Sequence, residues 1–140
     1  NIQNEITVPE ISGIVSDYAS VPEVRVKLVE LQREMSKRFN VIMDGRDIGT
    51  VVLKDAPFKF FLTATPEERA NRRFKELKER NIECEYEVIL KDIIERDYKD
   101  SHREVDPLRK ADDAIEVDTT GLNIKEVTEK INSVISNNIK

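Results

Sequence analysis

The sequence predicts an α/β fold in which short parallel strands alternate with helices. Two segments, Lys59–Ala64 and Ala114–Asp118, have the short apolar or alternating pattern of strands. Helical spacing of apolar residues precedes and follows each of them, and this alternation favours a layered parallel sheet. The 140 residues are enough for one domain of ordinary size with a single core.

The first confident helix is expected from Ser20 to about Phe39, after a stretch without clear periodicity over residues 1–19. Ser20 and Glu23 have the spacing of a capping box, and Pro22 suits the first helical turn. Four apolar side chains at three- and four-residue spacing are expected to form one buried face. They are Val24, Leu28, Leu31 and Met35.

Val41–Met43 has the pattern of a buried strand that ends in a loop at Asp44-Gly45. After the strand at Lys59–Ala64, Thr65 and Glu68 form a second capping box, which opens a charged helix to about Arg80. Asn81 interrupts that helix.

Two further helices complete the pattern. The first begins near Glu85, and its apolar stripe is Tyr86, Ile89, Leu90, Ile93 and Ile94. The second follows the strand at Ala114–Asp118 and starts at Asn123, which can cap it together with Glu126. Its apolar face is Val127, Ile131, Val134 and Ile135.

Composition excludes several classes of function. The net charge of −5 disfavours a nucleic-acid-binding module, because phosphate backbones attract basic surfaces. No apolar run is long enough to span a membrane, and Asn1–Pro9 lacks the pattern of a secretory signal. Cys84 is the only cysteine and His102 the only histidine, which argues against disulfides, Cys-rich zinc sites and a Cys/His nucleophile. We expect a cytoplasmic protein.

The most informative segment for chemistry is Asp44–Thr50. It follows a predicted strand, at the sheet edge where α/β proteins bind ligands, and it combines two carboxylates, an arginine and two glycines. Carboxylates at such an edge commonly hold hydrated magnesium in phosphate-transferring enzymes. A tight turn with surface charges is the alternative.

A second constellation consists of arginines on two helices that Asn81 separates: Arg72, Arg73, Arg96 and Arg103. Such helices could act as a lid that brings positive charge onto a phosphoryl group. Solvated helix surfaces are the alternative, since charge runs on helices are usually exposed. None of the glycines begins or completes the G-x-x-x-x-G-K-[ST] motif, so these residues contain no P-loop.

Several motifs occur in a distinctive order. They are Pro22-Glu23-Val24-Arg25, Asp44-Gly45-Arg46-Asp47-Ile48-Gly49-Thr50, Pro66-Glu67-Glu68-Arg69-Ala70 with Arg72-Arg73, Glu95-Arg96-Asp97 with Asp100 and Arg103, and Asp118-Thr119-Thr120-Gly121-Leu122. In this order they closely resemble bacterial cytidylate kinases over essentially the whole chain. The resemblance implies a three-layer, parallel-sheet nucleoside monophosphate kinase fold and transfer of the ATP γ-phosphoryl group to CMP or dCMP, with Mg2+.

The resemblance also implies roles for individual residues. Ser16, Arg25 and Asp47 would recognise cytosine, since a carboxylate can accept from the exocyclic amine while an arginine donates to ring acceptors. Arg46 and Arg103 would hold the CMP phosphate. Arg96 and Asp100 would contact the sugar, Arg72 and Arg73 would be lid arginines over the ATP phosphates, and Asp44 would order water around magnesium. Residues 1–40 would belong to the CMP-binding region and residues 41–140 to the kinase core, with a lid around 72–96.

One part of the family pattern is missing, namely the strand, P-loop and helix at the front. We therefore expect an incomplete fold, no meaningful kinase activity from these residues alone, and self-association through exposed sheet edges. Another nucleoside monophosphate kinase, a non-catalytic CMP-binding fragment and a structural remnant remain as alternatives.

Overall fold

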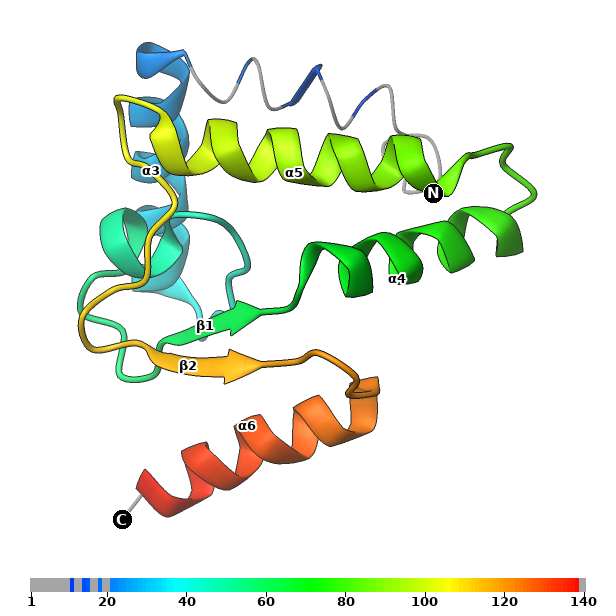
Figure 1. Ribbon diagram of the computed structural model, residues 1–140. Helices are drawn as coiled ribbons and strands as arrows, with labels where there is room; N and C mark the ends of the chain where they lie inside the picture. Colours follow the sequence, from blue (N-terminus) through cyan, green and yellow to red (C-terminus); the bar gives the residue numbers. More distant parts are fainter. Residues whose placement is uncertain (1–10, 12–13, 16–17, 19–20, 139–140) are drawn as a thin grey trace.

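The computed structural model describes residues 11, 14–15, 18 and 21–138. Within this part, two strands and the helices around them alternate along the chain, as Figure 1 shows. The elements are α3 (Pro22–Arg38), the π-helical turn η1 (Ile48–Val52), β1 (Phe60–Thr63), α4 (Pro66–Glu79), α5 (Tyr86–His102), β2 (Ile115–Asp118) and α6 (Ile124–Asn138). The predicted α/β class is confirmed at this level.

The sheet of the described residues consists of β1 and β2, which run parallel. Phe60 lies opposite Ile115 and Thr63 lies opposite Asp118. The ladder continues past β2, because the Thr119 amide donates to the Thr63 carbonyl at 2.8 Å. Both strands therefore end at the same edge, and that edge leads directly into α4 and α6.

Helices α4 and α5 form an antiparallel hairpin that extends from the end of β1 (Figure 1). The predicted cap is present, since the Thr65 hydroxyl accepts from the Glu68 amide at 3.2 Å. Asn81 ends the first helix with a φ of 54°, a left-handed conformation that asparagine tolerates better than most residues. The buried side chains between the two helices are Ala70, Leu77 and Ile89.

The prediction of a strand at Val41–Met43 is wrong. The segment has no regular structure, and the Ile42 side chain is fully exposed. A strand needs a hydrogen-bonded neighbour, and the sheet of the described residues offers none to this segment. An apolar run can be identified locally, but its partner cannot.

The prediction of a buried apolar face on α3 is also wrong, because the four side chains of that face are 39–52% exposed. No described helix or strand covers Val24, Leu28, Leu31 or Met35 to the depth of a core. The residue of α3 that is buried is Arg25, at 8% exposure. The N-cap is Val21 without a side-chain hydrogen bond, and Ser20, which was expected to cap the helix, lies outside the described residues.

Two other predicted features are confirmed. Helix α5 begins after Glu85, as expected, although Ile94 of its apolar stripe is 49% exposed. At the start of α6 the Asn123 amide donates to Glu126 at 2.7 Å and the Glu126 amide donates to Asn123 at 3.0 Å, which is a complete capping box. None of the helices within the described ranges combines the length and the apolar character that a bilayer crossing needs.

Candidate functional site

Arg25 is the centre of the candidate site. Its guanidinium makes an ion pair with Asp47, and its Nη2 and Nε donate to Asp106 Oδ2 at 2.9 and 3.3 Å. Asp47 comes immediately before η1, and Asp106 lies in the loop that follows α5. The fold thus brings together three segments that are far apart in the sequence. Two of these residues, Arg25 and Asp47, were predicted to act together.

Arg25 remains a cation in this position. Burial lowers the pKa of its guanidinium, but the hydrogen bonds to Asp106 and Asp47 outweigh burial and leave the pKa raised. A buried cation of this kind depends on its carboxylates, because removal of one partner leaves an uncompensated charge. The α3 helix therefore holds a fixed positive group at this site.

A second group of charges surrounds Asp100, which is 5% exposed on α5. Arg46 Nε lies 2.5 Å from Asp100 Oδ2, and Arg96 Nε lies 3.8 Å from the same oxygen. This oxygen nonetheless accepts no hydrogen bond of good geometry within the described residues. Burial and the nearby Arg46 cation lower the pKa of Arg96, with partial compensation by Asp100. Positive charge exceeds negative charge around this carboxylate.

Arg103 belongs to the group around Arg25. It is the residue that follows α5, and its Nε donates to the Asp106 carbonyl at 2.7 Å. Its Nη2 is buried and has no hydrogen-bond partner within the described residues. A buried guanidinium donor without an acceptor is costly, by about 1–3 kcal/mol, and an oxygen of an anionic ligand would satisfy it. Of the two residues that were predicted to hold the phosphate, Arg103 thus belongs to the group around Arg25, and Arg46 belongs to the group around Asp100.

The two groups together contain four arginines and three aspartates. The backbone joins them, because Asp100 precedes Arg103 by three residues and its carbonyl accepts from the Leu108 amide at 2.7 Å. We call the two groups together the Arg25 network. The members are Arg25, Arg46, Arg96, Arg103, Asp47, Asp100 and Asp106. Arginine binds phosphate and carboxylate oxygens through paired hydrogen bonds, and a surplus of guanidinium groups favours a small anion. The network suits an anionic ligand that also carries neutral polar groups for the carboxylates.

Asp106 is the member of the network that the sequence did not predict. A single aspartate before a proline in a loop is typical of a turn, and nothing local points to an arginine 81 positions earlier. Its φ of 50° is uncommon for a residue other than glycine, and the sequence does not predict this backbone conformation.

The two predicted lid arginines have different surroundings. Arg72 donates through Nη2 to the Thr119 carbonyl at 2.5 Å and through Nη1 to the Thr119 hydroxyl at 3.2 Å. It therefore lies at the carboxyl end of β2, beside an open hollow of about 940 Å3 that includes Thr63, Glu68 and Asn123. Arg73 instead donates to Glu76 of its own helix at 2.8 Å. The structure does not bring these two arginines to the network around Arg25.

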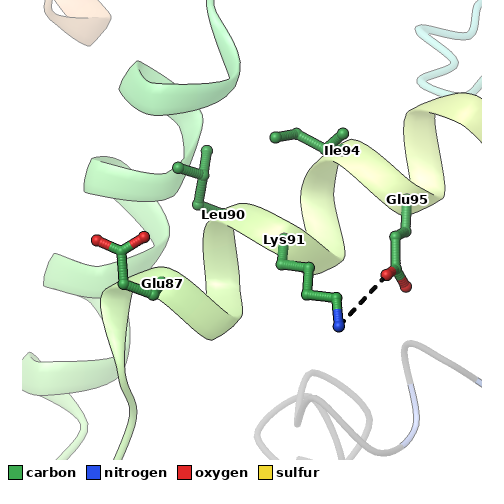
Figure 2. Close-up of a pocket in the computed structure, with 5 residues that line it drawn as sticks. All are labelled: Glu87, Leu90, Lys91, Ile94 and Glu95. Atoms are coloured by element: carbon green, nitrogen blue, oxygen red, sulfur yellow. Dashed lines mark ion pairs between the residues drawn. The ribbon is translucent and has the colours of Figure 1, made fainter.

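A smaller hollow of about 340 Å3 lies on α5 (Figure 2). Leu90 and Ile94 contribute apolar surface there, and Lys91 pairs with Glu95 at 3.7 Å. The exposed pair is an ordinary helix-surface contact. This hollow has none of the converging donors that the Arg25 network offers.

The remaining predicted residues have simpler outcomes. Ser16 lies outside the described residues. Asp44 is exposed, and no group of three or more metal-binding side chains gathers anywhere in the described ranges. One exposed carboxylate fits a magnesium ion that is held mainly by waters and substrate phosphates, which is how proteins commonly bind this ion.

Comparisons with known proteins agree with the geometry. The family model described as cytidylate kinase matches residues 1–137. A cytidylate kinase of Clostridium perfringens (strain SM101 / Type A) is 68% identical over 133 residues, which are 95% of this chain and 61% of that protein. A cytidylate kinase of Clostridium acetobutylicum is 60% identical over 139 residues, which are 99% of this chain and 64% of that protein.

A cytidylate kinase of Clostridium botulinum (strain Hall) is 54% identical over 135 residues, which are 96% of this chain and 62% of that protein. The chain thus spans a little over three fifths of the length of these curated relatives. The match to the family model nevertheless covers almost all of the chain and includes every residue of the network. The resemblance inferred from the sequence motifs is confirmed, and the chain belongs to the cytidylate kinase family.

Proposed function

We propose that this chain supplies the CMP-binding side of a cytidylate kinase, which transfers the γ-phosphoryl group of ATP to CMP or dCMP and yields ADP with CDP or dCDP. The observation that carries the proposal is the Arg25 network, in which arginines and aspartates surround the buried side chains of Arg25 and Asp100, and Arg103 Nη2 has no acceptor among the described residues. A nucleoside monophosphate offers both an anion for arginines and polar base edges for carboxylates. The relatives are named cytidylate kinases, which supports the choice of CMP.

In this proposal the two halves of the network recognise different parts of CMP. Arg25 and Asp47, with Ser16, bind the cytosine edge, since a carboxylate accepts from the exocyclic amine and a guanidinium donates to ring acceptors. Arg46 and Arg103 hold the phosphate. Arg96 and Asp100 contact the sugar. Residues 1–40 would then form part of the CMP-binding region, and residues 41–140 the kinase core.

The chemistry that these residues perform is positioning and charge stabilisation. Two guanidinium groups neutralise the CMP phosphate and fix the oxygen that attacks the γ-phosphoryl group, and in-line geometry accounts for much of the rate in this reaction class. Arg72 and Arg73 would approach from the lid, residues 72–96, to stabilise charge on the transferred group. Magnesium bound with ATP would neutralise the β- and γ-phosphates, with Asp44 holding one of its waters.

We further propose that these 140 residues are inactive as a kinase by themselves. They contain no G-x-x-x-x-G-K-[ST] motif, and phosphoryl transfer in this class depends on that loop and its lysine to hold the β- and γ-phosphates. A non-catalytic CMP-binding role is therefore the second candidate for the isolated chain. A coupled assay with ATP and CMP tests this, and turnover near that of an intact relative would contradict it.

Exposed features of the described residues support the proposal that the fold is incomplete. The edge of β1 away from β2 has no strand partner within residues 21–138, while Ile42 and the apolar face of α3 are exposed. Unpaired edges and apolar faces favour association, so we propose that the isolated chain self-associates through this side of the three-layer fold. Light scattering that reports a stable monomer with full helix content would contradict this.

Calorimetric titration with CMP tests the proposed site. Arg103→Ala removes the unsatisfied donor and is expected to weaken CMP binding about 10–100-fold, the cost of one charged hydrogen-bonding group. Arg109→Ala removes the same charge from an exposed residue six positions later and is the matched control, expected to change affinity less than about twofold. Equal effects of the two substitutions would reject the site.

A further inference from the structure

Asp106 contacts two arginines, Arg25 and Arg103, which bind different parts of the nucleotide in the proposed function. Its carboxylate accepts from Nη2 and Nε of Arg25, on α3, at 2.9 and 3.3 Å. Its backbone carbonyl accepts from Nε of Arg103, at the end of α5, at 2.7 Å. One residue thus connects the group assigned to the base with a group assigned to the phosphate.

The backbone of Asp106 makes both contacts possible. Its φ of 50° places it in the left-handed region, where a residue other than glycine is uncommon and is held by its surroundings. The loop is anchored on the other side of Pro107, since the Leu108 amide donates to the Asp100 carbonyl at 2.7 Å. A shift of Asp106 therefore moves the Arg103 acceptor together with the Arg25 carboxylate.

Two carboxylates, those of Asp47 and Asp106, bind Arg25. Asp47 is the carboxylate assigned to the base, and its Oδ2 contacts Arg25. Asp106 is 31% exposed at its side chain, against 14% for Asp47, and its carboxylate accepts from both Nε and Nη2 of Arg25, which fixes the orientation of the guanidinium. Arg103 is fixed in turn through Nε, which leaves its buried Nη2 for an anion.

We propose that Asp106 is a positioning residue that couples Arg25 to Arg103, so that the base and the phosphate of the nucleotide are recognised as one unit. The inference rests on the proposed function and extends it. Asp106 itself touches neither the transferred group nor the reacting atoms in this account. Its effect on a ligand is carried by the two arginines.

The test uses three ligands with the full chain: CMP, cytidine, which lacks the phosphate, and ribose 5-phosphate, which lacks the base. Asp106→Asn keeps the size of the side chain but removes the charge that ties Asp106 to Arg25, so the loop, and with it the carbonyl that accepts from Arg103, loses this anchor. We expect it to weaken cytidine and ribose 5-phosphate each by about 3–10-fold and CMP by about 10–100-fold, in the range of lost charged hydrogen bonds. Glu104→Gln removes the same charge from an exposed residue of the same loop and should change none of the three beyond about twofold.

Each outcome decides between distinct accounts. Loss of cytidine binding with unchanged ribose 5-phosphate binding would overturn the coupling and leave Asp106 as a partner of Arg25 alone. Equal losses of affinity in Glu104→Gln would also overturn the coupling, because any removal of negative charge from this loop would then weaken binding. If the unsubstituted chain fails to bind CMP at all, the proposed function falls and this inference with it, whereas normal CMP binding with an inert Asp106→Asn rejects only the inference.

A second measurement needs no substitution and so does not depend on the stability of a variant. Ribose 5-phosphate is titrated into the unsubstituted, isotope-labelled chain, and the arginine Nε–H resonances are followed by NMR. We expect the Arg25 and Arg103 signals to shift together with one apparent dissociation constant, although the probe carries no base. A shift of Arg103 with a stationary Arg25 would overturn the coupling.

Discussion

Arg69 of α4 and Asp97 of α5 form a bidentate ion pair, with Nη1–Oδ2 and Nη2–Oδ1 distances of 2.8 and 3.0 Å. The two side chains are 35% and 30% exposed, so water screens the pair only in part. Parallel hydrogen bonds between a guanidinium and a carboxylate fix orientation as well as distance. This pair therefore ties the two helices of the hairpin, which include the predicted lid, to each other.

A double-mutant cycle on Arg69→Ala and Asp97→Ala should reveal a coupling free energy of about 0.5–1 kcal/mol, at the upper end for partly exposed pairs. The free energy of unfolding in urea is the measurement. The exposed pair Lys91–Glu95 on α5 is the matched control, with an expected coupling of about 0.3 kcal/mol or less. Equal coupling in the two cycles would show that the hairpin is held by its apolar contacts alone.

The apolar contacts of the hairpin have their own test at Leu77, which is 2% exposed between α4 and α5. Leu77→Ala should lower the free energy of unfolding by about 2–4 kcal/mol, because it removes buried methyl groups and leaves a cavity. Leu28→Ala on α3 deletes the same atoms from a side chain that is 46% exposed and should cost less than about 1 kcal/mol. Urea denaturation compares the two, and similar losses would mean that the α3 face is covered in solution.

Stability should also depend on pH through Glu76. A hydrogen bond from Arg73 at 2.8 Å, against a smaller opposing effect of burial, holds the pKa of Glu76 below its ordinary value of 4.5. A lowered pKa in the folded state means that the contribution to stability is complete above about pH 4.5 and disappears as the pH falls through the folded-state pKa. Because the Glu76 side chain is 48% exposed, the contribution is about 0.5 kcal/mol or less.

Glu76→Gln should therefore be less stable than the unsubstituted chain near neutral pH, and the difference should vanish in acid. Glu79→Gln, at an exposed position of the same helix, controls for the loss of one carboxylate. Denaturation in urea at several pH values measures both. A constant difference between Glu76→Gln and the unsubstituted chain down to about pH 3 would contradict the assignment.

Local features of the fold were predictable because their signals lie within a few residues. Thr65 and Glu68 cap α4, Asn123 and Glu126 cap α6, and Asn81 ends a helix, each through hydrogen bonds or backbone angles that neighbouring residues determine. The two strands were also located correctly, since their apolar patterns are short and bounded by turn residues.

The errors concern structure that depends on distant partners. Val41–Met43 has the composition of a strand, but pairing requires a neighbouring strand that no local pattern supplies. The helical period of α3 identified an apolar face, yet periodicity does not show what covers it, and the buried residue of that helix is Arg25. The π-helical turn Ile48–Val52 has no sequence signal that distinguishes it from a loop.

The candidate site shows the same division. The family resemblance implied that Arg25 and Asp47 act together, and the two side chains form an ion pair in the structure. Arg72 and Arg73 are adjacent in the sequence and were assigned one role, but successive helical residues point in different directions, and they contact Thr119 and Glu76 respectively. Asp106 could be found only after the loop beyond α5 was placed against α3.

Discrimination between CMP and UMP tests the central claim most directly, because the two nucleotides share the sugar and phosphate and differ only at the base edge assigned to Arg25 and Asp47. Calorimetric titration of the chain should show CMP binding at least about tenfold more tightly than UMP, as expected from one well-formed set of base contacts. Asp47→Asn should reduce that ratio towards one while phosphate-dependent binding persists. Equal affinity of the unsubstituted chain for CMP and UMP, or an undiminished ratio in Asp47→Asn, would contradict the account.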